Sequence, residues 1–220
     1  MRDVVIFGMG QVAEVIHYYL AEEGGRNVVA WTVDAEYLTA AEHLGLPVVA
    51  FEEVEARYPP ETHEMFVAVS FKGVNKLREA KVAAAEAKGY TLTSHVSPRA
   101  AVWPKFVANP NTIIMEQNVI QPYVTVGRNV IMWSGNHVGH HTRIGDNCFI
   151  ASHAVISGNC EIGAGTFIGV NATLRDNITI GMRNVIGAGA LVLKSSDDNA
   201  VFIGAATEPS KVTSDRLRGI

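Results

Sequence analysis

The sequence predicts an α/β domain followed by an all-β parallel β-helix. Two observations predict this order: apolar runs alternate with helical stretches over the first 93 residues, and from residue 96 an aliphatic residue returns at every sixth position. A third is the composition, with 48% hydrophobic and 18% charged residues, which is typical of a folded globular chain. We therefore expect domains over 1–93 and 94–204, and a C-terminal tail over 205–220.

The first domain alternates candidate strands with candidate helices. Residues 11–25 carry apolar side chains at helical spacing, and 75–90 is rich in strong helix formers and ends near Gly89. Strands that alternate with helices in this way form a parallel sheet with crossover connections, so we expect a small Rossmann-like unit. Four apolar runs are the expected strands: 3–10, 27–34, 46–50 and 65–71.

A six-residue aliphatic period runs through the second domain without a slip. Every sixth residue from Val96 to Val192 is Val, Ile, Leu or Met, with Ala108 as the exception, and the next position is often Gly, Ala or Ser. This pattern is typical of a parallel β-helix in which three hexads close one triangular coil. Residues 18 apart then stack at about the 4.8 Å spacing of strands, giving about five to six coils. One expected inner column is Val102, Ile120, Val138, Ile156, Leu174 and Val192.

A histidine cluster interrupts this regular pattern in the stretch GNHVGHHTRIG, residues 135–145. Within the six-residue frame Val138 points inward, so at least one of His140 and His141 faces outward. Gly158 and Asn159 follow one coil later, and a glycine stacked beside a histidine leaves room for an elongated ligand. The cluster is therefore either a functional site or a solvated structural corner.

The two halves together resemble a known family. Residues 119–195 resemble the left-handed β-helix hexapeptide acyltransferases, and nearly the whole chain resembles the two-domain nucleotide-sugar acyltransferases of bacterial glycan synthesis. That group includes bacillosamine and perosamine N-acetyltransferases and proteins similar to sialic acid O-acetyltransferases. The resemblance implies left-handed coiling, a homotrimer and an acyl-CoA groove between adjacent prisms. It also implies acyl transfer, with acetyl-CoA as donor, to the amino group of a nucleotide-linked deoxysugar.

The resemblance assigns roles to the histidine cluster. Attack by an amine on a thioester needs a base, and an imidazole, which titrates near neutral pH, is suited to that role. His140 matches the position of the family's base, in HHTRIG. His141 stands where relatives often carry a carboxylate, and a neutral imidazole orients a base more weakly than a carboxylate does. The candidate acyl-CoA contacts are His153, Gly158, Asn159, Ala188 and Lys194.

The stretch FGMGQVAE, after a strand and before a helix, is a glycine turn suited to a phosphate. Relatives have a longer loop there with a histidine, so this shortened loop leaves nucleotide binding open. WTVD ends the second expected strand, and its acid either accepts hydrogen bonds from a nucleoside or is an ordinary strand-end aspartate. The candidate substrate-binding residues are Gly8, Gly10, Gln11 and Asp34.

Three other functions share parts of this pattern: a sugar O-acetyltransferase, a non-catalytic scaffold and a zinc enzyme. A sugar O-acetyltransferase would use the same base, and a non-catalytic scaffold would use none. The related γ-type carbonic anhydrases bind zinc through two histidines five apart and a third upstream, but positions 101, 104 and 117 are Ala, Pro and Gln, so no metal is expected.

The net charge of −4 without a basic block argues against nucleic-acid or membrane partners. Two cysteines and no secretion signal predict a cytoplasmic protein.

Overall fold

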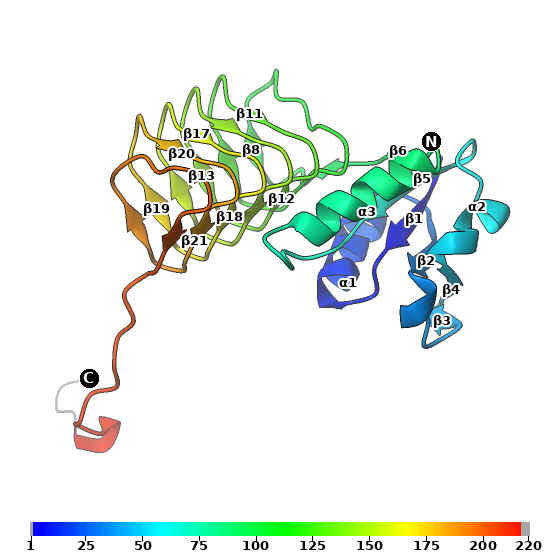
Figure 1. The fold of residues 1–220 in the computed structure, drawn as a ribbon, viewed down its shortest axis with the longest axis horizontal. Coiled ribbons are helices and arrows are strands. Elements are labelled where there is room, and N and C mark those ends of the chain that lie inside the picture. Colours follow the sequence, from blue (N-terminus) through cyan, green and yellow to red (C-terminus); the bar gives the residue numbers. More distant parts are fainter. Residues whose placement is uncertain (1, 217–220) are drawn as a thin grey trace.

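The computed structural model of the chain describes residues 2–216. It contains an α/β domain and a three-sided column of short parallel strands, shown in Figure 1. The predicted order, an α/β domain before a parallel β-helix, is confirmed. The last four residues of the predicted tail, 217–220, lie outside the described residues. None of the helices over 2–216 has the length and apolar character that a membrane span requires.

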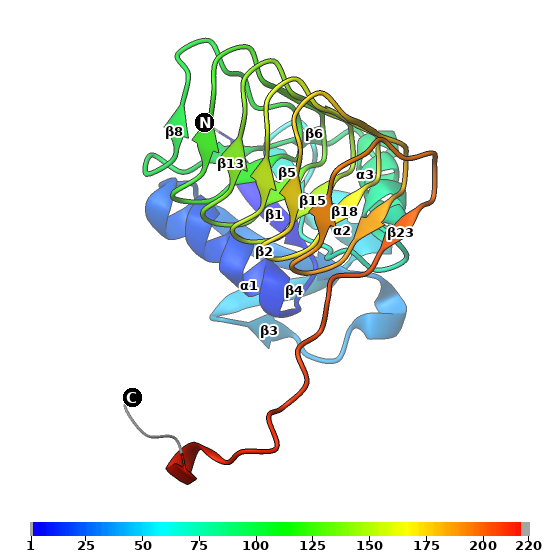
Figure 2. The same cartoon turned by 90° about the vertical axis from the view of Figure 1, so that its left-hand side faces the viewer.

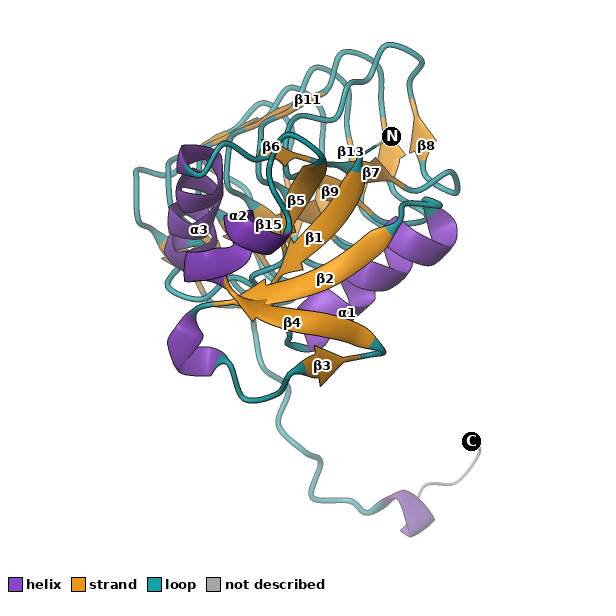
Figure 3. Cartoon of the chain, turned by 90° about the vertical axis from the view of Figure 1, so that its right-hand side faces the viewer, coloured by secondary structure: helices purple, strands orange, loops and turns teal. Residues whose placement is uncertain are grey.

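A six-stranded sheet, in the order β3-β4-β2-β1-β5-β6, forms the centre of the N-terminal domain (Figure 3). Its pairs are parallel except β3 with β4. The central strands are buried on both faces, which explains why they read as continuous apolar runs. The strands are β1 (Asp3–Phe7), β2 (Val28–Val33), β3 (Glu42–His43), β4 (Leu46–Ala50), β5 (His63–Val67) and β6 (Thr91–Leu92).

Helices cover both faces of this sheet. Helix α1 (Gln11–Tyr18) packs on one face together with the β-helix, and α2 (Val54–Arg57) and α3 (Lys76–Ala87) cover the other. Helix α1 continues into a π-helical turn over Tyr19–Glu23, a local widening that is frequent at functional or contact sites. The short 3-10 turns span Ala35–Tyr37, Phe51–Glu53 and Ser214–Arg216.

Three parallel sheets form the sides of the β-helix, and Figure 2 looks along the stacked coils. The first side contains β8 (Ala101–Val102), β10 (Val119–Ile120), β13 (His137–Val138), β16 (Val155–Ile156), β19 (Thr173–Leu174) and β22 (Leu191–Val192). The second side contains β11 (Thr125–Val126), β14 (Arg143–Ile144), β17 (Glu161–Ile162) and β20 (Thr179–Ile180). The third side contains β7 (His95–Val96), β9 (Ile113–Ile114), β12 (Ile131–Met132), β15 (Phe149–Ile150), β18 (Phe167–Ile168), β21 (Val185–Ile186) and β23 (Val201–Phe202).

The aliphatic period determines the register of the coils. Ile120 pairs with Val102 and with Val138, so the predicted inner column along the first side is confirmed. The exception to the period, Ala108, falls on the second side of the first coil, and within the described residues no strand forms there. The last coil is also shorter. Strands of earlier coils pair at intervals of 18 residues, but Val185 pairs with Val201, which is closer in sequence.

The corners between the sides have a left-handed residue that returns every six positions. Asparagine is frequent there because its short side chain tolerates positive φ. His141 (φ 61°) and His153 (φ 60°) both occupy this corner position, which the sequence did not indicate. The whole series is Asn111, Gln117, Tyr123, Asn129, Gly135, His141, Asn147, His153, Asn159, Gly165, Asn171, Asn177, Arg183 and Gly189.

Arg78 of α3 joins the two domains. Its guanidinium group is fully buried and donates to Asn129 Oδ1 at 3.1 Å, to the carbonyl oxygens of Asn147 and Cys148 at 3.0 Å, and to that of Ser70 at 3.2 Å. No carboxylate of the described residues forms an ion pair with Arg78, so the dipoles of backbone carbonyl groups stabilise its positive charge. Burial lowers the pKa of Arg78 to about 10.

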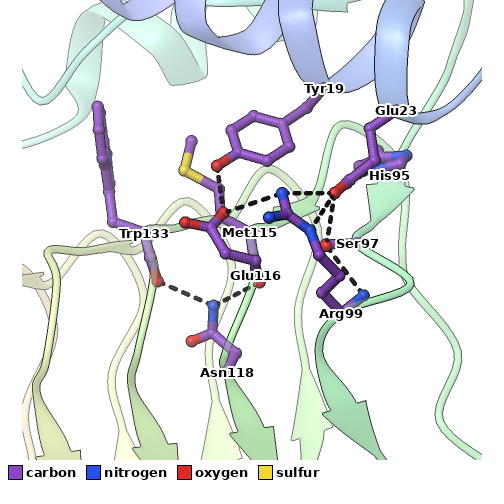
Figure 4. Close-up of polar contacts among 9 residues, drawn as sticks. All are labelled: Tyr19, Glu23, His95, Ser97, Arg99, Met115, Glu116, Asn118 and Trp133. Atoms are coloured by element: carbon purple, nitrogen blue, oxygen red, sulfur yellow. Dashed lines mark hydrogen bonds and ion pairs between the residues drawn. The ribbon is translucent and has the colours of Figure 1, made fainter.

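A second polar contact joins the π-helical turn to the first coils (Figure 4). Tyr19 Oη donates to Glu116, and Glu23 accepts from His95 Nε2 at 2.8 Å and from Arg99 Nε at 3.0 Å. Burial disfavours the charged form of Glu23, but hydrogen bonds led by those of His95 and Arg99 outweigh it and lower its pKa. Burial and the bond to Glu116 raise the pKa of Tyr19 to about 12.

Candidate functional site

His140 and His141 lie in the corner that connects β13 on the first side to β14 on the second, and both are exposed. Their Nδ1 atoms are 3.1 Å apart. The backbone N–H of His140 donates to Gln121 Oε1 at 2.9 Å, and the ring of His141 stacks on Tyr123 with centroids 4.6 Å apart. The pair is therefore held on both sides while remaining open to solvent.

The contact between the two rings restricts their protonation. One Nδ1 must donate and the other accept, so the contact holds when no more than one of the two rings is cationic. When His140 donates from Nδ1, its Nε2 carries a free lone pair, as a general base requires. His141 then accepts as a carboxylate would, without the negative charge.

Gly158 lies directly beside the ring of His140. A Cβ atom at this position would come within 2.8 Å of both Cε1 and Nε2 of the imidazole. As expected, glycine leaves the imidazole uncovered by a side chain from this position, and the room for a ligand beside the ring stays a prediction. Gly158 thus allows this orientation of His140.

The predicted acyl-CoA contacts lie at two different corners. Asn159 follows Gly158 at the corner of His140, and its backbone N–H donates to His140 O at 2.8 Å. Lys194 follows β22 and is exposed at the same corner. His153 and Ala188 lie instead at the corner between the third and first sides, after β15 and β21. Within one chain the structure does not bring these two residues to His140.

The predicted substrate-binding residues line cavities of the N-terminal domain. A cavity of about 650 Å³ includes Gly8, Gly10 and Asp34, and one of about 320 Å³ next to it includes Gln11. Gly8 has φ +115°, a conformation that favours glycine, and a Cβ there would lie 3.0 Å from Ala68 O. The four candidates are therefore brought together around the end of β1 and the start of α1.

Asp34 is already engaged in an ion pair in this cavity. Its Oδ1 lies 2.5 Å from Lys81 Nζ on α3, which reaches across the end of the sheet. The sequence did not indicate Lys81, nor Tyr37, Lys72 and Leu77, which line the same cavity. The helix pattern of 75–90 showed no sign that one edge of the helix faces a cavity.

The N-terminal cavities and His140 lie on different sides of the molecule. The N-terminal domain packs against Ile131 and Phe149 on the third side. His140 occupies the corner between the first and second sides, which is opposite the third. In Figure 3 the second-side strand β11 lies at the top, away from β2 and β4. In one chain the histidine pair and the N-terminal cavities therefore do not face each other.

No group of three or more His, Cys, Asp or Glu side chains within residues 2–216 is arranged to hold a metal ion. His137, the third histidine of the cluster, lies in strand β13 and not in the corner with His140 and His141. The zinc arrangement of the carbonic anhydrases is thus not reproduced by the described residues.

Comparisons with known proteins agree with this architecture. The family model described as bacterial transferase hexapeptide (six repeats) matches residues 124–158 and 159–194. One similar solved structure is a histidine-to-asparagine variant of perosamine N-acetyltransferase from Caulobacter crescentus in complex with CoA and GDP-perosamine. Its sequence is 28% identical and the TM-score is 0.83, and the match covers 92% of this chain and 93% of that one. No curated protein matches the chain significantly.

A second solved protein has the same two-domain extent. The acetyltransferase domain of PglB from Neisseria gonorrhoeae is 26% identical, with a TM-score of 0.81, over 91% of this chain and 96% of that one. The same domain in complex with acetyl coenzyme A is 25% identical, with a TM-score of 0.77, over 91% and 95%. Residues 124–194 therefore match the bacterial transferase hexapeptide repeat, and nearly the whole chain is similar in structure to solved acetyltransferases that act on sugars or bind acetyl coenzyme A.

Proposed function

We propose that this chain transfers the acetyl group of acetyl-CoA to the amino group of a nucleotide-linked deoxysugar. The observation that carries the proposal is the His140–His141 pair, held over Gly158 at an exposed corner of a hexapeptide β-helix. The similarity over 92% of the chain to a transferase seen with CoA and GDP-perosamine supports it.

His140 acts as the general base in the proposed reaction. The neutral amine attacks the thioester carbonyl carbon, a new C–N bond forms and the C–S bond breaks. His140 Nε2 takes the proton that the amine loses and passes it to the leaving thiolate to give CoA, which returns His140 to its neutral form. His141 holds His140 in the tautomer with a free Nε2 by accepting from its Nδ1, so it acts as a positioning residue.

The N-terminal domain, which we propose to be Rossmann-like, binds the nucleotide of the acceptor. Helix α1 begins at Gln11, in the wall of the cavity that Gly8 and Gly10 also line, and the start of a helix is suited to a diphosphate. Asp34 and its partner Lys81 border the larger cavity, where a nucleoside finds both a hydrogen-bond acceptor and a cation.

A homotrimer completes this site in our proposal. Because His140 and the N-terminal cavities lie on different parts of one chain, one acceptor molecule reaches both only if the cavity belongs to a second copy. Adjacent β-helices would also bring His153 and Ala188 of one subunit to the corner of Gly158, Asn159 and Lys194 in the next. The groove between them is the proposed acyl-CoA site, with Lys194 near a phosphate. The cytoplasmic location stays a prediction.

A thiol-release assay tests the proposal. The purified chain is incubated with acetyl-CoA and a panel of nucleotide-linked amino sugars and hydroxy sugars, and free CoA is measured. We expect release with an amino sugar, and loss of release in His140→Ala with the assembly intact. Release only with hydroxy sugars would make the chain an O-acetyltransferase, and release unchanged in His140→Ala would remove the assigned base.

A further inference from the structure

His141, which orients the proposed base, is itself held by few polar contacts. Its Nδ1 contacts the Nδ1 of His140, and among the described residues no other hydrogen bond reaches its side chain. The exposed ring lies edge-on to that of His140, with 83° between the two planes. The side chain at the same corner one coil later is engaged elsewhere, because the Asn159 amide donates to Asn177 Oδ1 at 2.8 Å. A different contact must therefore fix the plane of the His141 ring.

The ring of Tyr123 covers one face of His141. Tyr123 stands at the same corner one coil earlier, and the two rings stack with centroids 4.6 Å apart and 30° between their planes. Aromatic rings at this separation attract each other. A stacked imidazole resists rotation about its Cβ–Cγ bond, which is the rotation that would carry the Nδ1 of His141 away from that of His140. The stack thus supplies a restraint that the hydrogen bonds do not.

Tyr123 is also an unusual residue for its backbone conformation. Its φ of 67° lies in the left-handed region, where a bulky side chain is an outlier. The other members of the corner series are Asn, Gly, Gln, His or Arg, and asparagine or glycine adopts this conformation at lower cost. Tyr123 is 62% exposed, so it adds little to the core. Strained positions cluster at functional sites, and the stack on His141 gives this strained position a function.

Trp103 supports Tyr123 from the first coil. The centroids of the two rings are 5.7 Å apart and their planes are tilted by 46°. Trp103 follows β8, is half-buried and packs against the interior aliphatic residues of the β-helix. A continuous series of contacts therefore leads from the core of the first coil through Trp103 and Tyr123 to His141, and from there to His140.

We propose that Tyr123 is a further positioning residue for acyl transfer, whose ring fixes the plane of His141 and thereby the tautomer of His140. This inference rests on the proposed function. The stack involves the ring of Tyr123 and not its hydroxyl group, so phenylalanine should serve as well as tyrosine. Because the ring acts through His141, its loss should lower kcat and leave KM unchanged.

A double-mutant cycle tests this role. Tyr123→Asn removes the ring and suits the φ of 67°, and Tyr123→Phe is the matched control that keeps the stack. Each replacement is made in the wild type and in His141→Ala. Values of kcat and KM are measured with acetyl-CoA and the best acceptor of the nucleotide amino-sugar panel, and thermal unfolding shows that each variant is folded.

We expect Tyr123→Asn to lower kcat by about 10-fold in the wild type, and Tyr123→Phe to leave kcat and KM unchanged. In His141→Ala the same change to asparagine should alter kcat by less than about 2-fold, because the ring then has no imidazole to hold. Three results overturn the inference: an unchanged kcat in Tyr123→Asn, equal losses in the two backgrounds, or a rise in KM alone, which would indicate contact with a substrate.

A spectroscopic measurement needs no acceptor and so separates this inference from the proposed function. Nitrogen-15 NMR of histidine-labelled protein at about pH 8, where an ordinary imidazole is neutral, reports which ring nitrogen of His140 carries the proton. His140→Ala assigns the signals. We expect the Nδ1–H form to dominate in the wild type and in Tyr123→Phe, and a mixture of both tautomers in Tyr123→Asn.

The same tautomer ratio in Tyr123→Asn and in the wild type overturns the inference even where acyl transfer is found. A shifted ratio without acyl transfer to any acceptor supports the positioning of His140 and contradicts the proposed function alone.

Discussion

His140 and His141 face each other through their Nδ1 atoms at 3.1 Å, so the ring that orients the proposed base is itself an imidazole. An imidazole in this position accepts one hydrogen bond while neutral and none once it is protonated at both nitrogens. A doubly protonated His141 would donate to His140 Nδ1, so that His140 would carry its own proton on Nε2 and could not act as a base, whereas a carboxylate partner only accepts.

Replacement of His141 tests this positioning role. His141→Asp keeps an acceptor and adds a negative charge, and we expect it to keep kcat within about 10-fold while moving the acid limb of the pH–rate profile to higher pH, because the carboxylate favours the cationic form of the base. His141→Asn also keeps an acceptor and suits the backbone, because asparagine tolerates the φ of 61°. His141→Ala should lower kcat more than either, and equal pH profiles in the wild type and His141→Asp would contradict the role.

Gly158→Ala should reduce acyl transfer without unfolding the chain. Its added Cβ would lie within 2.8 Å of the His140 ring, which can rotate away because it is exposed at the corner. We expect kcat to fall by about 10²-fold, as for loss of a positioned base, with little change in Tm. Gly25→Asn is the control, since a Cβ there meets no atom within 4 Å and asparagine tolerates its φ of 60°. Full activity in Gly158→Ala would mean that the ring orientation does not matter.

Arg78 should contribute strongly to stability although it forms no ion pair among the described residues. Arg78→Met would leave the carbonyl oxygens of Asn147 and Cys148 without their buried donor. We expect the free energy of unfolding to fall by about 2–4 kcal/mol in urea denaturation. Lys76→Met, an exposed position on the same helix, should change it by less than about 0.5 kcal/mol. Equal stability of the two variants would show that Arg78 does not hold the domains together.

The contact of Glu23 with His95 and Arg99 predicts loss of stability in acid. The pKa of Glu23 is lowered in the folded chain from an ordinary value of 4.5, so its ionised form contributes stability above that pH. This contribution is lost as pH falls through the lowered folded pKa. Glu23→Gln should therefore be less stable than the wild type near pH 7, and the difference should shrink at about pH 3.

Urea denaturation at the two pH values measures this effect, and Glu53→Gln, at an exposed position, is the control. The control should show no difference from the wild type at either pH. A stability gap for Glu23→Gln that stays constant between the two values would contradict a coupled carboxylate at this contact.

The aliphatic period made most of the β-helix predictable, because one inward residue per hexad determines which strands pair. The exception at Ala108 coincides with the side of the first coil that lacks a strand in the described residues. The sequence also indicated His140, His141 and the turn of Gly8 and Gly10, because these residues stand next to periodic elements.

Contacts between the domains could not be predicted in this way. Arg78 reads as an ordinary polar residue of a helix, yet it bonds Cys148, seventy residues later, because α3 docks on a corner of the β-helix. The π-helical turn that places Tyr19 and Glu23 against the first coils is likewise set by packing. The period of three hexads per coil, in contrast, already places His153, two hexads after His141, at another corner than His140.

Mixed trimers test the central claim most directly, that His140 acts on an acceptor held by another copy. His140→Ala lacks the base, and Gly10→Phe fills the N-terminal cavity from a position where a Cβ meets no atom within 4 Å. Each variant alone should be inactive. When the two are co-expressed and purified together, random pairing should restore about a quarter of the sites and a matching share of acyl transfer. Mixed assemblies that form but stay inactive would contradict the claim.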